Sequence, residues 1–465
     1  MPAPPKAVAK RVYDVAVLGP DIGGAVTAAL SARRGLRTLL APMVPLSVVR
    51  ESDGWLLPAA HPMLPPLRQL SAAVGTLDDL GLSADLQRQA SGAQGAFQIL
   101  TEKLRLSLPP DPARRRSELR RELSAISAQE AETALDSLER LGHPWDAFLR
   151  EPPPWPPRGF FERRRVHKVV PPQPQLPEGL IGDCLAALAP FAASLTGDSA
   201  PEATAREAAS LFRAPLRLWG GPAQLADLLR KKATESGGDV IADGAEQLRL
   251  DRKAITFVLG GSEVTASCVV LACGAERIGA LLQGGGRLER KLAEEAALPV
   301  ARKVTLAHYV VRAEGLPLAL EEAALLLGHA MGPLVISALP ARRTRGEAEN
   351  ERLLTVARVS DAGFSDEQGL LNSVRAALAP VLPFFDRHIV HQSADLNPPL
   401  SHPILRPHDD AEPIGLRPIS EAHDRVLFAS AATYPGFGLE GQILAARAAA
   451  DQALAISGRK TVSAV

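Results

Sequence analysis

The stretch VYDVAVLGPDIGG, residues 12–24, decides the fold. Its first seven residues form an apolar run rich in β-branched side chains, which predicts a strand that ends at Gly19. An Ala-rich helical segment follows as far as Arg34, Gly35 ends it, and the run LRTLL at 36–40 predicts a second strand. A strand, a helix and a second strand in this order predict a parallel βαβ unit in an open α/β sheet.

The turn GPDIGG at 19–24 lies where a dinucleotide-binding loop would lie. In the pattern G-x-G-x-x-G, the first glycine makes the turn, the second lets the backbone approach the pyrophosphate, and the third packs the helix on the strand. Gly19 and Gly24 hold the first and third places, but Asp21 holds the second. A carboxylate near 4 Å from one phosphate charge costs on the order of 4 kcal/mol at an effective dielectric of about 20.

A second glycine-rich turn, TYPGFGLEG at 433–441, follows a predicted strand at 425–429 and precedes a predicted helix at 442–457. The backbone amides at such a helix N-terminus form a site for an anion or a ring carbonyl. Two places near the expected cofactor lack the usual residues. Ala41 and Pro42 stand where an acid commonly meets a ribose hydroxyl, and SAA at 430–432 has no glycine.

These stretches resemble the motifs of the FAD-dependent flavoprotein superfamily of amine oxidases, protoporphyrinogen oxidases and carotenoid (phytoene) desaturases. TYPGFGLEGQILAARAAA at 433–450 is similar to the family's last motif, in which the turn meets the flavin. DGW at 53–55 and WGGP at 219–222 resemble two further elements. GGDV at 237–240 with VVLA at 269–272 resembles the strand that borders the adenine and its partner.

The resemblance implies an α/β, two-lobed flavoprotein-like fold with a Rossmann-type FAD-binding domain and a substrate-type lobe. The discontinuous FAD-binding domain would comprise residues 1–65, 215–290 and 415–465. The substrate-type lobe would comprise residues 66–214 and 291–414.

The resemblance also implies site residues. Those expected to contact FAD belong to the motifs above: Gly19, Asp21, Gly23, Gly24, Val240, Thr433, Tyr434, Pro435, Gly436, Gly438 and Gly441. Lys303 is the candidate catalytic residue, because a lysine in a similar stretch of amine oxidases holds a water near the flavin; a solvated lysine at a strand edge is the alternative. No metal site is expected, because the histidines at 388, 391, 402 and 408 lie in a Pro-broken region without a supporting acid pattern.

Two functions of different classes stay open. The first is an FAD-dependent oxidoreductase that acts on a small apolar substrate, by amine oxidation or polyene desaturation. The second is a flavin-free pseudo-oxidoreductase that serves as a binding or scaffold protein, with a protein partner. Asp21, Ala41-Pro42 and the stretch at 430–432 favour the second, because all three alter contacts to one ligand. The turn at 433–441 favours the first.

Composition excludes other classes. Lys and Arg number 52 and Asp and Glu also number 52, so the chain lacks the basic footprint of a nucleic-acid binder. Aromatic residues make up 4%, too few for base-stacking platforms. No apolar run reaches about 18 residues, so no membrane span is expected. The N-terminal stretch does not resemble a secretory signal, and a cytoplasmic location is expected.

The segment RGFFERRRVHK at 158–168 is both basic and aromatic. We expect it to be an exposed loop whose residues Phe160 and Phe161 pack on the body of the protein. The alternative is peripheral contact with the anionic inner face of a membrane.

Overall fold

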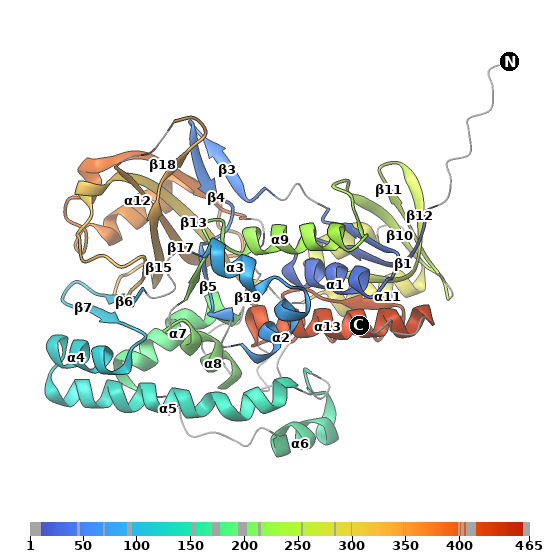
Figure 1. Ribbon diagram of the computed structural model, residues 1–465, viewed down its shortest axis with the longest axis horizontal. Coiled ribbons are helices and arrows are strands. Elements are labelled where there is room, and N and C mark those ends of the chain that lie inside the picture. Colours follow the sequence, from blue (N-terminus) through green and yellow to red (C-terminus); the bar gives the residue numbers. More distant parts are fainter. Residues whose placement is uncertain are drawn as a thin grey trace.

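The structure is a computed structural model of the chain, shown in Figure 1. It describes residues 11–43, 47–67, 70–90, 95–150, 152, 155–169, 177–193, 202–212, 215–252, 254–282, 285–298, 300–346, 348, 350–398, 400, 404–405 and 415–458. Two large sheets organise these residues, one on the right of Figure 1 and one on the left, with helices packed against both. The fold is therefore of the mixed α/β class that the sequence predicts.

The first sheet has seven strands, in the order β10-β11-β12-β1-β2-β9, with β20 also paired to β12. Its strands are β1 (Arg11–Leu18), β2 (Thr38–Ala41), β9 (Asp239–Val240), β10 (Ala245–Leu250), β11 (Ile255–Leu259), β12 (Ser262–Leu271) and β20 (Val426–Phe428). The strand β1 pairs in parallel with both β2 and β12, and β12 pairs in parallel with β20. The strand ends of β1, β12 and β20 therefore meet at one edge of the sheet.

The predicted βαβ unit is confirmed as β1, α1 (Ile22–Arg33) and β2. The helix α1 packs against α9 (Gly221–Glu235) and α13 (Gly438–Ser457), and together they bury one face of the sheet. All of α1 from Ile22 to Ala32 is buried, which explains why its sequence is apolar on every side. The other face is covered by α10 (Ala275–Leu281) and α11 (Arg287–Ala296).

The second sheet has eight strands, in the order β18-β13-β17-β15-β14-β6-β7, with β19 paired to β13. They are β6 (Phe97–Leu100), β7 (Arg105–Leu108), β13 (Val300–Arg312), β14 (Ala323–Leu326), β15 (Leu334–Pro340), β17 (Glu351–Asp361), β18 (Ile389–Asp395) and β19 (Ile404–Leu405). The helix α12 (Glu367–Leu378) covers one face of this sheet through a cluster around Tyr309.

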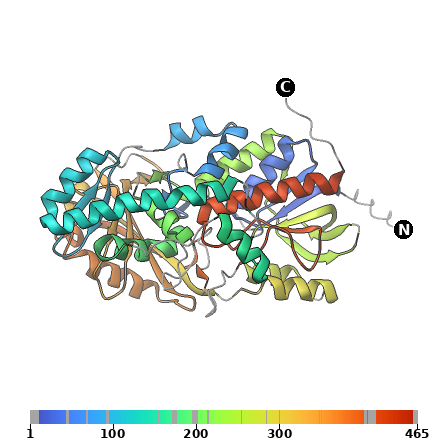
Figure 2. The same ribbon diagram turned by 90° about the horizontal axis from the view of Figure 1, so that it is seen from below.

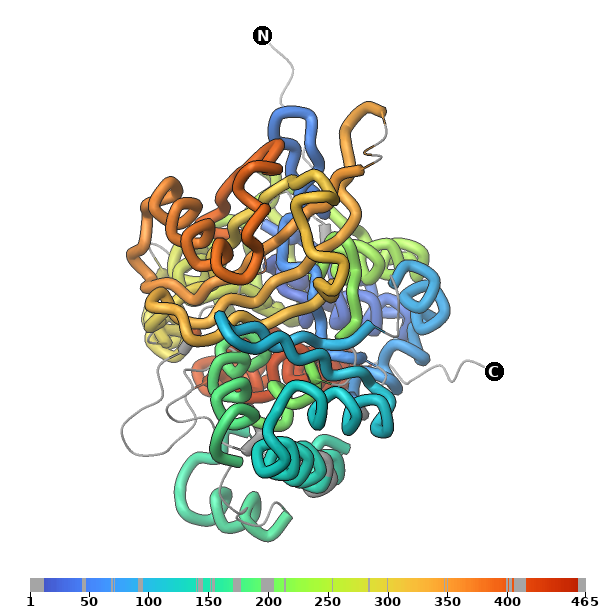
Figure 3. Tube along the Cα trace, turned by 90° about the vertical axis from the view of Figure 1, so that its left-hand side faces the viewer, coloured from blue at the N-terminus to red at the C-terminus, as the bar shows by residue number. Residues whose placement is uncertain are grey.

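A helical layer lies below the opposite face, as Figure 3 shows. It contains α4 (Pro112–Glu122), α5 (Ala125–Arg150), α7 (Gly179–Ala193) and α8 (Glu202–Ser210). The sequence predicts mostly helix from 66 to 150, yet β6 and β7 form a strand pair inside that range. The strand β6 is buried throughout and β7 buries alternate side chains. The strand β6 joins the sheet by parallel pairing with β14, more than 200 residues away in the chain. Such a distant partner leaves no local signal in the sequence.

Smaller elements connect these layers. The helices α2 (Ser71–Asp79) and α3 (Ser83–Gln89) follow the short strand β5 (Met63–Leu64), which pairs with β8 (Leu216–Arg217). The strands β3 (Val49–Ser52) and β4 (Trp55–Pro58) pair with β16 (Arg342–Arg343). This last pairing joins a segment of the predicted FAD-binding domain to a segment of the predicted substrate-type lobe, and the domain boundaries stay a prediction.

The helix α6 (Gly159–Val169) lies at the lower edge of Figure 1, beyond the end of α5. Figure 2 shows it projecting beneath the long helices α5 and α13. The segment is a helix and not the expected loop. Phe160 and Phe161 are 70% and 84% exposed, so the expectation that they pack on the body is wrong too. The helix buries only Val166, which lies on its inner face, and the two rings lie on the outer face. None of the helices in the described part of the chain is long and apolar enough to cross a bilayer.

Candidate cofactor site and apolar pocket

The structure brings the first and last predicted turns together at the edge where β1, β12 and β20 end. The Ala431 amide donates a hydrogen bond to Asp21 Oδ2 at 3.1 Å. The Gly23 amide donates to Gln442 Oε1 at 3.4 Å. Residues more than 400 positions apart in the chain therefore share one buried junction, which we call the turn junction: residues 19–24 together with 430–442.

Packing alone accounts for the glycines of the first turn. A Cβ on Gly19, whose φ is +132°, would lie 2.1 Å from the Ala272 carbonyl oxygen. A Cβ on Gly23 would lie 2.2 Å from the Ala429 carbonyl oxygen, and one on Gly24 would lie 2.5 Å from the Ala272 Cβ. These glycines let α1 approach β12 and β20 closely, so their presence does not by itself require a bound dinucleotide.

Asp21 is the polar centre of the turn junction. It occupies the N-cap position of α1, but its carboxylate makes no capping bond to that helix and accepts from Ala431 instead. Burial raises the pKa of Asp21 to about 7, although the Ala431 amide and the charge of Arg277 act in the opposite direction. The carboxyl group therefore lies between the two turns, where the resemblance implies a pyrophosphate.

The last turn is held by aromatic packing. Phe437 is fully buried and contacts the rings of Trp145, Phe148 and Trp155, with centroid distances of 5.4 to 5.6 Å. Trp155 Nε1 also donates to the Pro435 carbonyl oxygen at 3.0 Å. The turn therefore has a structural role: it joins α13 to α5 and to the segment that follows α5.

The other predicted residues of this turn are buried as well. Thr433 Oγ1 accepts from the Ser430 amide at 3.2 Å inside the turn. Tyr434, Gly436 and Gly438 have φ values of +54°, +92° and +47°. A Cβ on Gly438 would lie 1.8 Å from the Ala192 carbonyl oxygen of α7. Positive φ and close approach explain why glycine recurs here.

A buried ion cluster below the last turn was not predicted from the sequence. Glu440, in the first turn of α13, accepts from Arg206 Nη1 at 2.8 Å and from the Ala72 amide at 2.8 Å. Arg206 Nη2 also binds Asp146 Oδ1 at 2.6 Å, and its Nη1 binds Glu207. Burial raises the pKa of Glu207 to about 8. This cluster ties α13 to α2, α5 and α8; only the folded chain brings these partners together.

The residues of the turn junction do not fit a pyrophosphate. A helix N-terminus binds phosphate through free amides and a positive dipole. Here a carboxylate and a carboxamide of the chain itself accept from the Ala431 and Gly23 amides. Ala41, at the end of β2, is fully buried and offers no acid for a ribose hydroxyl. Val240, on the edge strand β9, is 36% exposed and lies apart from this junction.

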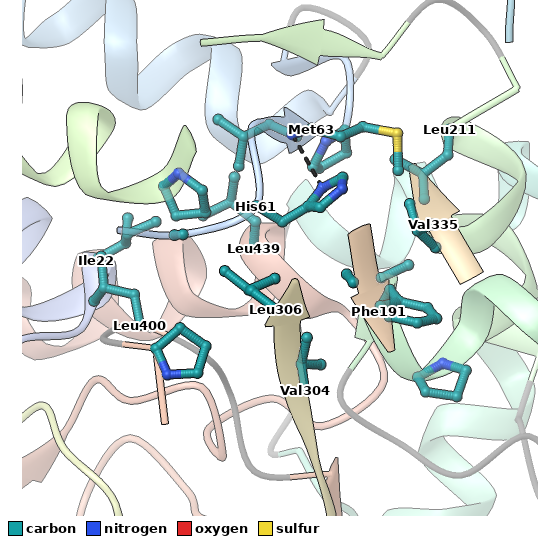
Figure 4. A pocket seen from close by; sticks show the side chains of 18 residues that line it. Ile22, His61, Met63, Phe191, Leu211, Val304, Leu306, Val335, Leu400 and Leu439 are labelled. Carbon is teal, nitrogen blue, oxygen red and sulfur yellow. Dashed lines mark hydrogen bonds between the residues drawn. The ribbon is translucent and has the colours of Figure 1, made fainter. Parts of the chain in front are cut away.

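An apolar pocket lies beside the turn junction. Ile22 of α1 and Leu439 of α13, which both belong to the junction, form part of its wall. The remaining wall comes from the loop after β4, from α7, and from the face of the eight-stranded sheet that carries Leu306 and Val335. The pocket has a cavity volume of about 110 Å³ and opens in part to solvent. Figure 4 shows mainly aliphatic and proline side chains around it.

His61 is the polar exception in this wall. Its Nδ1 accepts from the Met63 amide at 3.3 Å, the dashed line in Figure 4. Its Nε2 is buried, and the ring faces the backbone carbonyl groups of Val335 and Thr355. Burial lowers the pKa of His61 to about 4, so the ring is neutral near pH 7. The sequence had not marked this residue, because one histidine in a Pro-rich loop carries no motif.

Lys303 does not line the pocket. Val304 and Leu306 of β13 do, and successive side chains of a strand point to opposite faces. Lys303 Nζ donates instead to Asn397 Oδ1 at 3.0 Å. Its catalytic role stays a prediction that this position does not support. No group of three or more metal-ligating side chains occurs in the described ranges, and the histidines at 402 and 408 lie outside them.

The chain shares its fold with solved amine oxidases, so the predicted resemblance is confirmed at the level of the fold. A putrescine oxidase redesigned at its cofactor site has 14% identity and a TM-score of 0.60, with 95% of this chain and 99% of that one covered. Cyclohexylamine oxidase from Brevibacterium oxydans has 13% identity and a TM-score of 0.59, with 96% and 99% covered. No family model and no curated protein matches the sequence.

Proposed function

We propose that this chain is a flavin-free member of the fold that binds a small apolar molecule in the pocket beside the turn junction. The observation that carries the proposal is the hydrogen bond from the Ala431 amide to the buried Asp21 carboxylate. This bond occupies the place at the α1 N-terminus that a pyrophosphate would need.

Electrostatics supports this assignment. An ionised Asp21 would repel each phosphate by about 4 kcal/mol at 4 Å and an effective dielectric near 20. A protonated Asp21 would avoid the repulsion, but its carboxyl group would still fill the space between the turns. Either form must leave Ala431 before a phosphate can bind, and the amide would then need a new partner.

A second candidate is an FAD-dependent oxidoreductase that acts on a small apolar substrate. The fold favours it, and so does the position of the pocket, which adjoins the N-terminal residues of both α1 and α13. If FAD binds, it would supply the redox chemistry, and the protein would supply the apolar surroundings. A cytoplasmic location and a protein partner stay predictions for either candidate.

An absorbance spectrum of the purified full-length chain separates the two candidates. We expect a colourless protein that retains no added FAD through gel filtration. Bound-flavin absorbance that survives gel filtration would contradict the proposal and support the oxidoreductase.

The Asp21→Gly variant tests the cause. If the carboxylate is the main obstacle, this variant should bind FAD at least about tenfold more tightly than the wild type. The control is Asp424→Gly, which removes an exposed carboxylate far from the turn junction and should change nothing. Equal affinities of the wild type and Asp21→Gly would show that Gln442 and the missing ribose acid exclude FAD without help from Asp21.

A further inference from the structure

The helix α6 exposes two aromatic rings on the side that faces away from the body of the protein. Phe160 and Phe161 are 70% and 84% exposed, and their ring centroids lie 5.8 Å apart. Within the described ranges, no other two large exposed apolar residues are adjacent in the sequence. Single exposed apolar side chains are common on proteins, whereas grouped ones mark interaction surfaces.

Basic side chains surround these rings. Arg164, Arg165 and Lys168 are all exposed on the same helix. Successive residues of a helix are about 100° apart, so Phe160, Arg164 and Lys168 follow one another along one side. Phe161 and Arg165 lie beside them. We call this outer surface of the helix, made by these five residues, the α6 face.

The acidic side chain of α6 is engaged on the inner side. Glu162 accepts from Arg417 Nη2 at 2.5 Å and from the Arg158 amide at 2.6 Å. The Arg158 amide and the Arg417 guanidinium lower the pKa of Glu162, so its carboxylate stays ionised near neutral pH. Val166, four residues later, is buried on the same side. Because the helix contains no other acid, the α6 face is both basic and apolar.

The helix α4 is also basic but differs in both respects. Its sequence PARRRSELRRE contains five arginines, yet none of its residues is a large exposed apolar side chain. Arg121 pairs with Glu118 at 2.5 Å and with Glu122 at 2.8 Å, which compensates part of the charge within the helix. The helix α4 is therefore a solvated helix, whereas α6 combines basic side chains with exposed rings.

We propose that the α6 face binds an anionic lipid surface, with its two phenylalanine rings inserted at the level of the headgroups. Basic side chains gain from the negative potential of anionic lipid, and the rings next to them gain from transfer into the interface. Charge complementarity favours this partner over a second copy of the chain, whose α6 face carries the same positive charge. The inference is independent of the ligand in the apolar pocket.

Flotation of the full-length protein with vesicles tests the choice of partner. The wild type should float with vesicles that contain about 30% phosphatidylglycerol in phosphatidylcholine and should not float with pure phosphatidylcholine. Salt near 1 M should lower flotation, because the Debye length falls to about 3 Å. No flotation with the anionic vesicles, or equal flotation with both lipids, would overturn the proposal.

Two sets of substitutions locate the contact. Replacement of Arg164, Arg165 and Lys168 by alanine should lower the partition coefficient about 100-fold, because each basic side chain near an anionic surface contributes about fivefold. Phe160→Ser with Phe161→Ser should lower it at least about tenfold, because the rings no longer bury apolar area in the interface. Both sets leave the inner side of α6 unchanged.

Matched controls remove the same kinds of side chain elsewhere. A triple alanine variant of Lys103, Arg114 and Arg120 removes three exposed basic groups, and Phe384→Ser removes a ring that is 61% exposed. Both controls should bind the anionic vesicles within about twofold of the wild type. Equal binding of all variants would show that α6 does not make the contact and would overturn the proposal.

The substitution Phe161→Trp reports insertion directly. The four tryptophans of the chain are 3% to 7% exposed, so this variant adds one at an exposed position. With anionic vesicles its emission should shift to shorter wavelength, and brominated lipid should quench it, whereas the emission of the wild type should change little. Flotation without either change would overturn the insertion of the rings.

Two other occupants of the α6 face would give different results. A second copy of the chain would form a dimer without lipid, and Phe160→Ser with Phe161→Ser would convert it to a monomer in light scattering. A nucleic acid would require tight binding of single-stranded DNA that the same double variant abolishes. Either result would overturn the assignment to lipid.

Discussion

The turn junction and the apolar pocket are neighbours, but hydrogen bonds hold the junction together whereas apolar side chains line the pocket. In the junction, Asp21 and Gln442 accept from the amides of Ala431 and Gly23. In the pocket, the wall is almost entirely apolar, and the His61 ring is its polar exception. The difference indicates that the polar contacts of the junction and the apolar wall of the pocket can vary separately, because they use different residues at the starts of the same two helices.

The helices α1 and α13 illustrate this division. Asp21 faces the junction, whereas the next residue, Ile22, faces the pocket. Phe437 packs into the aromatic cluster, whereas Leu439, two residues later, faces the pocket. A change on one side of each helix end therefore need not disturb the other side.

The largest effect should come from breaking the aromatic cluster that supports the junction. Phe437→Ala should lower the free energy of unfolding by about 3–5 kcal/mol, because it leaves a cavity among three large rings. Urea unfolding measures this change. Phe384→Ala, at a 61% exposed position, should stay within about 0.5 kcal/mol of the wild type. A loss below about 1 kcal/mol for Phe437→Ala would show that the turn contributes little to stability.

A smaller effect should come from the charge of Asp21. Because its folded pKa of about 7 lies above the usual 3.8, the folded state holds a proton that the unfolded state releases between these values. Stability should therefore fall as pH rises from 5 to 8, with a contribution from Asp21 of about 2–3 kcal/mol.

The variant Asp21→Asn separates this contribution from those of other groups. Asparagine retains an oxygen that can accept from Ala431 but carries no charge. The difference in unfolding free energy between Asp21→Asn and the wild type should therefore grow in favour of the variant from pH 5 to pH 8. Parallel pH profiles of the two proteins would contradict the buried, proton-retaining carboxyl group.

The smallest effect is expected at Lys303. Lys303→Met should change stability by less than about 0.5 kcal/mol, because the lysine makes one exposed hydrogen bond to Asn397. Affinity for a small apolar ligand of the pocket should stay within about twofold of the wild type, since Lys303 does not line the pocket. A tenfold loss of affinity would restore the predicted role of this lysine at the site.

Local sequence patterns were sufficient for some elements and insufficient for others. The βαβ unit at β1, α1 and β2 and the turn before α13 were predictable, because periodicity and glycine spacing act over short distances. The β6–β7 pair was missed, because its strands are stabilised by β14 far along the chain. The helix α6 and the exposure of Phe161 were missed as well, because the segment was expected to be a loop and a local pattern does not show which side chains find a neighbour.

The sequence by itself determined the order of motifs, the βαβ start and the anomaly of Asp21 within a glycine turn. Only the tertiary structure decided where the Asp21 carboxylate points and that Ala431, 410 positions later, supplies its hydrogen bond. It also decided that His61 lies in an apolar wall, with its Nε2 atom buried. Hydrogen bonding and burial depend on neighbours brought together by folding, and a pattern in sequence carries no distance between residues hundreds of positions apart.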